Sequence, residues 1–345
     1  MRAVSYAATG SLPRLGEWPD PPCPDDGVVV RVGATGVCRS DWHAWVGHDP
    51  VPLPQVPGHE LAGTVAEVGR DVRRWQVGDR VTVPFVCGCG RCAWCLAGET
   101  QVCPDQTQPG FTGPGSFAEL VALSAADTNL VRLPDEMAFV TAASLGCRLA
   151  TAYRALVTHG RLQQGEQVAV HGCGGVGLSA VAVAAALGAR VVAVDVSDEA
   201  LSLATSLGAT ATVRSSDPVD AVRDLTGGGA HVSLDAVGSP ATAVASVRSL
   251  RRRGRHVQVG LLLGEAAAPP LPMDLVVAQE LSVHGSHGMP AGQYPELLAL
   301  VTGGALDPTR LVGRVIGLEE AGEALAAMSD PAGRSGAGMT VVRID

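Results

Sequence analysis

The sequence predicts an α/β protein in which a doubly wound parallel sheet is inserted into a β-rich domain. In roughly the first 150 residues, short apolar runs are separated by glycine and proline, which is typical of an all-β module with little helix. From about Arg148, apolar strands alternate with helical stretches, which indicates parallel strands joined by right-handed crossovers. After about Ser286 the pattern is mixed again, and it ends in a strand over Met339–Ile344.

The length of the chain supports this division. At 345 residues it exceeds the size at which a single hydrophobic core usually divides, so two domains are expected. We assign residues 1–148 and 287–345 to the β-rich domain and residues 149–286 to the inserted domain. Hydrophobic residues make up 46% and charged residues 17% of the chain, which is typical of a well-buried globular protein.

The β-rich domain should begin with a strand within Met1–Gly10, because this stretch has no helical pattern. Its further strands are expected in four apolar runs bounded by turn residues: Val28–Val32, Leu61–Val68, Arg80–Val83 and Ala118–Leu123.

The inserted domain should contain six strands, because apolar runs alternate with helical stretches; the nearly uncharged residues 168–196 are interpreted as the buried centre of the parallel sheet. The basic run Arg251–Arg255 is interpreted as the charged end of a helix before a glycine cap. The expected strands are Val168–His171, Val191–Asp195, Ala209–Val213, His231–Ala236, Arg255–Gly260 and Leu281–Gly285. The expected helices are Leu178–Leu187, Glu199–Leu207, Val219–Leu225 and Ala241–Arg252.

The charge and the N-terminus limit the partners. The net charge of −9, from 25 basic and 34 acidic residues, repels phosphate backbones and anionic membranes. We therefore expect neither nucleic acid nor a membrane as a partner. The N-terminus shows no basic-then-apolar export signal, so we expect a cytoplasmic protein whose cysteines stay reduced.

A run of cysteines with the spacing C-x2-C-x2-C-x7-C is the most informative motif. Four thiolates within 15 residues can converge on one tetrahedral zinc, which accepts such a set without redox chemistry. An iron–sulfur cluster is the alternative, although bacterial ferredoxins have three residues in the last gap rather than seven. Free thiols are the second alternative. The neighbouring Cys87 is interpreted as a free thiol, with a spare ligand as its alternative role. The four expected ligands are Cys89, Cys92, Cys95 and Cys103.

The pattern G-x-G-x-x-G follows an apolar strand and opens an alanine-rich helix, which is the context of a dinucleotide-binding Rossmann turn. Gly172 would permit the tight turn, Gly174 would let the backbone approach a pyrophosphate, and Gly177 would allow close helix–strand packing. Asp195 ends the next strand, where a carboxylate can bind both ribose hydroxyls and repel a 2′-phosphate. NAD is therefore expected rather than NADP. The expected cofactor-binding residues of this domain are Gly172, Gly174, Gly175, Val176, Gly177, Asp195, Val259 and Gly260.

A second metal site is suggested by Cys38, His59 and Cys147. Two thiolates and one imidazole make a set that leaves a fourth position on zinc open for water or substrate. These residues span more than 100 positions, so spacing does not establish that they converge. Taken singly, the cysteines could be buried inert thiols, and the histidine could be a core residue.

The stretch Gly58-His59-Glu60-x2-Gly63-x5-Gly69-x2-Val72 resembles the zinc alcohol dehydrogenase signature of the medium-chain dehydrogenase/reductase family. The cysteine run resembles that family's structural-zinc lobe, and the glycine turn resembles its coenzyme turn. The resemblance covers essentially the whole chain and implies a Rossmann domain inserted into a GroES-like catalytic domain. It also implies a catalytic zinc held by Cys38, His59 and Cys147, with Glu60 as an occasional fourth ligand. Two zinc ions per chain are therefore expected.

The resemblance further implies that Ser40 and His43 form the proton relay. It places Arg39 near the coenzyme phosphates and Thr151 against the nicotinamide. Chemistry supports the relay independently, because zinc lowers the pKa of a bound alcohol and histidine titrates near neutral pH. The short segment from Cys103 to Phe111 resembles the shorter type of family member, so a tetramer is expected rather than a dimer.

The expected activity is NAD-linked interconversion of an alcohol and its aldehyde or ketone. If the aromatic residues near the motifs line the pocket, primary alcohols with apolar or aromatic groups are favoured; ordinary core packing is the alternative role for each. A polyol or sugar dehydrogenase and a non-catalytic NAD- and zinc-binding protein are the alternative functions. The candidate pocket residues are Trp42, Trp45, Phe85, Phe111 and Met289.

Overall fold

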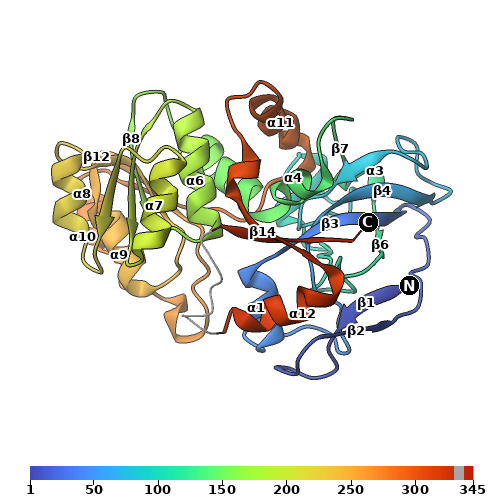
Figure 1. The fold of residues 1–345 in the computed structure, drawn as a ribbon. Helices are drawn as coiled ribbons and strands as arrows, with labels where there is room; N and C mark the ends of the chain where they lie inside the picture. The colour runs from blue at the N-terminus through green and yellow to red at the C-terminus, as the bar shows by residue number, and fades with distance from the viewer. Residues whose placement is uncertain (330–337, 345) are drawn as a thin grey trace. The chain divides into compact units, whose positions relative to one another are not determined.

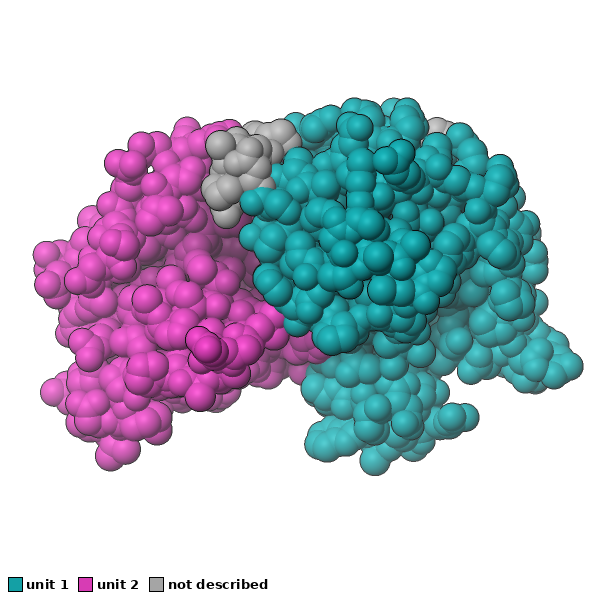
Figure 2. Space-filling view, turned by 90° about the horizontal axis from the view of Figure 1, so that it is seen from below, with its two compact units in different colours: residues 1–150, 288–298, 312–345 teal, residues 151–287, 299–311 magenta. Residues whose placement is uncertain are grey.

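The protein is described here by a computed structural model, which covers residues 1–329 and 338–344. The chain divides into two compact units, coloured separately in Figure 2. The first unit contains residues 1–150, 288–298 and 312–345, and the second contains residues 151–287 and 299–311. Each unit has a sheet of its own, and the fold class predicted from the sequence is confirmed.

The second unit is built on a parallel sheet, which Figure 1 shows in green to orange. Six of the described strands form it in the order β10-β9-β8-β11-β12-β13, and every neighbouring pair is parallel. The strands are β8 (Gln167–His171), β9 (Arg190–Asp195), β10 (Ala211–Arg214), β11 (Ala230–Asp235), β12 (Leu250–Gln258) and β13 (Ser282–Gly285).

The strand order of this sheet reverses between β8 and β11, which are neighbours although two strands separate them in sequence. In doubly wound sheets, ligands bind at this reversal, beyond the carboxyl ends of the strands. Right-handed crossovers put the helices before and after the reversal on opposite faces, and α6 accordingly contacts α7 while α8 contacts α9. The helices are α6 (Gly175–Ala186), α7 (Asp198–Ser206), α8 (Val219–Leu225), α9 (Pro240–Arg248) and α10 (Met273–Ala278).

The run Arg251–Arg255 is not the end of a helix, and that prediction was wrong. Helix α9 ends at Arg248, and the arginines belong to strand β12. The reason is the pairing with β11, where Ala230 opposes Leu250 and Val232 opposes Arg255. The buried Leu250 starts the strand early, and the extra residues form an irregularity in the ladder that exposes the side chains of Arg251, Arg252 and Arg253.

The first unit is built on a mostly antiparallel sheet in the order β14-β15-β3-β4-β5-β7, with β6 also paired to β3. Valine dominates the long strand β3, as expected for a β-branched residue on a pleated surface. A separate hairpin consists of β1 (Arg2–Ser5) and β2 (Arg14–Glu17). The sheet strands are β3 (Val28–Val37), β4 (Glu60–Val68), β5 (Arg80–Thr82), β6 (Leu120–Leu123), β7 (Val131–Arg132), β14 (Val312–Gly317) and β15 (Met339–Arg343).

Most helices that begin in the first unit are short, and two of them lie next to candidate site residues. Helix α1 (Arg39–Trp45) follows β3 directly, and a π-helical turn over Leu145–Leu149 follows α4 (Phe139–Ala143). No helix of the described residues is long and apolar enough to cross a membrane. The other α-helices that begin in this unit are α2 (Ala93–Leu96), α3 (Ala126–Asn129), α5 (Ala150–Arg154), α11 (Tyr294–Thr302) and α12 (Ala321–Ala327).

Candidate functional site

Four buried side chains meet in the first unit. The ligand atoms of Cys38, His59, Glu60 and Cys147 all lie within 4.8 Å of one another. Strands β3 and β4 bring the first three together, because Gly36 pairs with Glu60 in the antiparallel ladder. The π-helical turn adds the Cys147 thiol. The structure therefore brings together the residues that spacing alone left apart.

Asp41 organises this cluster from the first turn of α1. Its carboxylate is buried and accepts three hydrogen bonds. Oδ1 accepts from the Gly58 amide at 3.0 Å and from His59 Nδ1 at 2.8 Å, while Oδ2 accepts from the Cys38 amide at 3.1 Å. One carboxylate thus fixes two of the three segments that supply the cluster.

The imidazole of His59 is oriented for a ligand on its other nitrogen. Since Nδ1 donates to Asp41, neutral His59 has its lone pair on Nε2. This atom is buried and has no hydrogen-bond partner among the described residues. Burial lowers the pKa of His59, but the charges of Asp41 and Cys38 outweigh burial and raise it well above its ordinary value. An unpartnered ring nitrogen opposite a carboxylate is the arrangement of a metal-binding histidine.

The two thiols of the cluster lie within 4.8 Å of each other and shift each other's pKa. A hydrogen bond with Cys147 lowers the pKa of Cys38 well below its ordinary value, and the same hydrogen bond together with burial raises that of Cys147. A bound cation would displace the protons of these groups and meet two thiolates and one neutral imidazole, a ligand set suited to zinc.

Glu60 is paired with a residue that the sequence did not single out. Its carboxylate forms a bidentate ion pair with Arg148, including an Nε–Oε1 hydrogen bond of 2.9 Å and a second bond from Nη2 to Oε2. Burial raises the pKa of Glu60 to about 7, although Arg148 opposes the shift. Only glycine fits at position 36, because a Cβ there would lie 2.0 Å from Glu60 Oε2. The ion pair is therefore buried, with Gly36 packed directly against it.

The residues expected to handle protons lie on α1. Ser40 is half-buried in its first turn, and His43 is half-buried in its last turn. Arg39 is exposed, stacks 3.8 Å over the Trp42 ring and donates from Nη1 to the Met328 carbonyl at 2.6 Å. Burial, followed by the charges of Arg39 and His48, lowers the pKa of His43.

The candidate pocket residues fall into different environments. The rings of Phe85 and Phe111 lie edge-on to His59, with centroids at 5.8 and 5.2 Å. Met289 is buried, and the neighbouring Gly288 approaches Phe85 closely. Trp45 lies in a hydrophobic core instead, where its Nε1 donates to the carbonyl of residue 11 at 2.7 Å.

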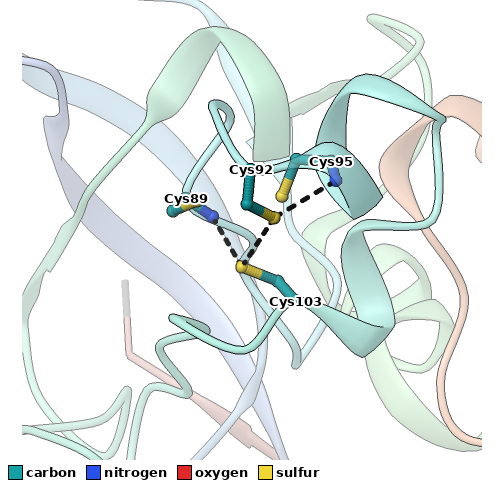
Figure 3. A group of neighbouring side chains, drawn as sticks. All are labelled: Cys89, Cys92, Cys95 and Cys103. Carbon is teal, nitrogen blue, oxygen red and sulfur yellow. Dashed lines mark hydrogen bonds between the residues drawn. The ribbon is translucent and has the colours of Figure 1, made fainter.

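The cysteine lobe forms a second cluster, shown in Figure 3. The Sγ atoms of Cys89, Cys92, Cys95 and Cys103 all lie within 4.8 Å of one another. The sulfurs of Cys92 and Cys103 are 3.7 Å apart, and a tetrahedral zinc with bonds of about 2.3 Å requires an edge of about 3.8 Å. Backbone amides lower the pKa of Cys89 to about 6, whereas burial raises that of Cys95 to about 12.

The surroundings of the lobe explain its local geometry. Gly88 cannot carry a side chain, because a Cβ would lie 2.7 Å from the Cys95 sulfur. The buried Asn129 side chain accepts from the amide and donates to the carbonyl of Gly88, each at 2.9 Å. Cys87 lies outside the cluster in a hydrophobic core, and burial raises its pKa to about 12.

The glycine turn of the second unit lies between β8 and α6. Gly172 has φ +91°, and a Cβ at Gly177 would lie 1.7 Å from the Gly172 carbonyl oxygen. These two positions hold the helix against the strand. A Cβ at Gly174 would meet nothing within 4 Å, so this side of the turn is open. Gly175 and Val176 form the first turn of α6, whose amides can face an anion.

Asp195 lies at the carboxyl end of β9, next to this turn. Its Oδ2 accepts from the Cys173 amide at 2.6 Å, and its Oδ1 accepts from the amides of Val196 and Ser197 at 2.7 and 2.9 Å. The carboxylate thereby fixes the turn. Carboxylate oxygens each accept more than one hydrogen bond, so ribose hydroxyls can still be bound.

The other residues expected at the cofactor lie at the same carboxyl edge or at the start of the unit. The amides of Val259 and Gly260 both donate to the Asp235 carbonyl, at 3.0 and 2.8 Å. A Cβ at Gly260 would lie 2.2 Å from the Gly238 amide nitrogen. The segments that follow β11 and β12 therefore pack tightly against each other. The hydroxyl of Thr151 is buried and has no partner among the described residues.

Three functional candidates were missed from the sequence: Asp41, Arg148 and His48. The spacing C-x2-D at the start of α1 is a signal for Asp41, since an acid at this position can cap the helix. Arg148 follows Cys147 directly, but nothing in the sequence indicates its partner. His48 hydrogen-bonds to His43, with 3.0 Å between the Nδ1 atoms, and a histidine just beyond the helix end was the available signal.

Comparisons with known proteins agree with this geometry. Residues 24–135 match the family described as "Alcohol dehydrogenase GroES-like domain", and residues 175–303 match "Zinc-binding dehydrogenase". The chain is 39% identical to an alcohol dehydrogenase of Geobacillus stearothermophilus over 264 residues, which is 75% of this chain and 76% of the relative. It is 32% identical to a sorbitol dehydrogenase of Bacillus subtilis over 317 residues, 88% of each chain.

Among solved structures, alcohol dehydrogenase TADH from Thermus sp. ATN1 superimposes with a TM-score of 0.92 over 100% of both chains, at 31% identity. The chain belongs to the zinc-containing alcohol dehydrogenases of the medium-chain dehydrogenase/reductase family, as the sequence motifs indicated. It is an oxidoreductase.

Proposed function

We propose that the chain is a zinc-dependent, NAD-linked alcohol dehydrogenase, and that Cys38, His59 and Cys147 bind its catalytic zinc. One observation supports this most strongly. The Nε2 atom of His59 is buried without a partner among the described residues, within a cluster that includes two buried thiols, while Nδ1 is held by Asp41. A core histidine would be expected to satisfy both ring nitrogens.

The donor set fits zinc. Two sulfurs and one imidazole nitrogen from the protein leave a fourth position for substrate. When bound, zinc acts as a Lewis acid that favours loss of the alcohol proton and polarises a carbonyl in the reverse direction. Asp41 fixes the imidazole orientation and its tautomer. Arg148 holds Glu60 beside the set, where its carboxylate would be available as a further ligand.

The second unit fits NAD. NAD supplies the nicotinamide ring that accepts hydride from the alcohol carbon. The open side of the turn at Gly174 and the first amides of α6 would bind the pyrophosphate. Asp195 would bind the ribose hydroxyls and repel a 2′-phosphate, which favours NAD over NADP. Arg39 would contribute a positive charge near the phosphates, and Thr151 would lie against the nicotinamide.

Protons would leave through α1. Ser40 is suited to accept the alcohol proton by hydrogen bond, and His43 is suited to pass it toward water. The half-buried His43 has a lowered pKa, so it does not retain a proton at neutral pH. A group that releases its proton readily favours oxidation of the alcohol.

The aromatic rings beside His59 favour an apolar substrate. The rings of Phe85 and Phe111 form T-shaped contacts with this imidazole, which gives the proposed metal site an apolar flank. We therefore favour primary alcohols with apolar or aromatic groups. The similarity to a sorbitol dehydrogenase supports polyols as the alternative substrate class. A screen of NADH formation with benzyl alcohol, straight-chain alcohols and sorbitol separates the two.

The proposed metal role is tested with Cys147→Ala, using Cys87→Ala as the matched control. Both cysteines are buried, but Cys87 belongs to neither cluster. We expect two zinc ions per chain in the wild type and in Cys87→Ala, and one in Cys147→Ala. Alcohol oxidation should be lost only in Cys147→Ala. Full turnover by Cys147→Ala would contradict the proposal.

We further propose that the protein is a cytoplasmic tetramer. Sedimentation of the purified chain would test the number of subunits.

A further inference from the structure

We propose that His48 is the outer member of the proton relay and carries protons between His43 and water. This inference rests on the proposed function, since it assigns a residue to the same relay. It adds an imidazole that lies five positions beyond the expected end of the relay.

The two imidazoles are in direct contact. The Nδ1 atoms of His43 and His48 are 3.0 Å apart, and the ring centroids are 5.3 Å apart. At this distance one Nδ1 donates its proton and the other accepts, so the pair shares a proton along one hydrogen bond.

The local fold places His48 for this contact. Helix α1 ends at Trp45, and Gly47 turns the chain with φ +86°. The His48 amide then donates to the His43 carbonyl at 2.9 Å. Backbone and side chain of His48 thus contact the same residue, which fixes the ring position.

Trp42 holds both rings from the side. It lies edge-on to His43 and His48, with centroid distances of 5.1 and 5.5 Å. Its own position is fixed, because Arg39 stacks on its face and its Nε1 donates to the Ser329 hydroxyl at 2.8 Å. Packing against Trp42 therefore holds the His43 and His48 rings in place.

Exposure and charge give the pair a direction. His43 is half-buried, whereas His48 is exposed and can exchange protons with water. The charged groups that act on His43 are Arg39 and His48, which disfavour its protonated form, and Cys38 and Asp49, which favour it. Burial also disfavours protonated His43 and is the largest of these effects. A proton on His43 therefore passes readily to the exposed His48.

The proton transfer is balanced at the two Nδ1 atoms. After the His43 ring takes up a proton, its Nδ1–H bond breaks as an Nδ1–H bond forms on His48. His48 then releases a proton from Nε2 to water or buffer. One proton enters the pair, one leaves, and no electron moves.

The test compares His48→Gln, His43→Gln and the double variant in the zinc-loaded chain. Glutamine keeps a polar side chain but cannot pass a proton at neutral pH. In weak buffer, we expect His48→Gln to lower kcat for alcohol oxidation by about ten-fold, since water replaces the outer transfer only in part. Added imidazole buffer should restore the rate, and the double variant should be no slower than His43→Gln. His231→Gln, a half-exposed histidine of the other unit, should leave the rate unchanged.

A second measurement does not depend on turnover. In the coenzyme-free protein labelled with 13C-histidine, NMR titration should show the pKa of His43 rising when His48 is replaced by Gln. An unchanged His43 titration would overturn the pairing. A wild-type rate in His48→Gln, or a loss that imidazole does not restore, would overturn the relay role. If the wild-type chain oxidises no alcohol at all, the proposed function fails, whereas the NMR result still reports on the pair.

Discussion

Replacing Asp41 by Asn perturbs the candidate metal centre without touching a proposed ligand. The Asp41 carboxylate accepts from His59 Nδ1 and the Gly58 amide through Oδ1, and from the Cys38 amide through Oδ2. Asparagine has a single acceptor oxygen. If that oxygen keeps His59 and Gly58, the new NH2 group faces the Cys38 amide as donor against donor.

The size of the effect follows from this mismatch. An unsatisfied buried donor costs about 1–3 kcal/mol. Loss of a carboxylate partner of a metal-binding histidine typically weakens metal binding by about 10- to 100-fold. The second figure corresponds to about 1.4–2.8 kcal/mol, so the two estimates agree. We expect Asp41→Asn to weaken zinc binding at Cys38, His59 and Cys147 by this factor.

The assay is a competition with a chelator in which the release of each zinc is followed. In Asp41→Asn, one zinc per chain should leave at a 10- to 100-fold lower chelator concentration, and the zinc of the cysteine lobe should be retained as in the wild type. Asp79→Asn is the control, because Asp79 is also a buried carboxylate but binds Arg132 and the Gln76 amide. If Asp41→Asn retains both zinc ions as the wild type does, Asp41 does not support zinc binding at Cys38, His59 and Cys147.

Three further predictions follow from other buried or charged groups. Arg148→Met leaves Glu60 buried without its partner, so the free energy of unfolding should fall by about 3–5 kcal/mol in a urea titration; a loss below about 1 kcal/mol would contradict the buried ion pair. Burial lowers the pKa of His171 to about 3 and of His256 to about 4, against about 6.5 in the unfolded chain. Stability is therefore full above pH 6.5 and falls toward pH 4, by about 2 kcal/mol per histidine at pH 5. His256→Gln should flatten the fall in Tm between pH 7.5 and 5, and an unchanged slope would refute this origin. Asp195→Gly should lower the NAD:NADP ratio of kcat/KM by about ten-fold or more, because the carboxylate no longer repels the 2′-phosphate; an unchanged ratio would remove Asp195 from cofactor selection.

The sequence predicted the local features of this protein well, because their signals lie within one short segment. The spacing of Cys89, Cys92, Cys95 and Cys103 is enough to predict a cluster, since 15 residues cannot separate them far. The alternation of strands and helices predicted the parallel sheet for the same reason. Helix Val219–Leu225 has the bounds that its pattern indicated.

Features that depend on tertiary contacts could not be predicted in the same way. The convergence of Cys38 with Cys147 requires the pairing of β3 with β4 and a π-helical turn, and neither has a sequence signal. In the sequence, Asp41 resembles any acidic residue in the first turn of a helix. Its role becomes visible only from its hydrogen bonds to Cys38, Gly58 and His59. The run Arg251–Arg255 has good helix propensity, but pairing with β11 overrides it.

The most direct test of the account is anomalous diffraction at the zinc edge from crystals of the zinc-saturated protein. We expect two peaks per chain, one within the cysteine lobe and one bounded by Cys38 Sγ, Cys147 Sγ and His59 Nε2. The lobe peak serves as an internal control for zinc loading. A peak in the lobe with none beside His59 would contradict the proposed catalytic centre.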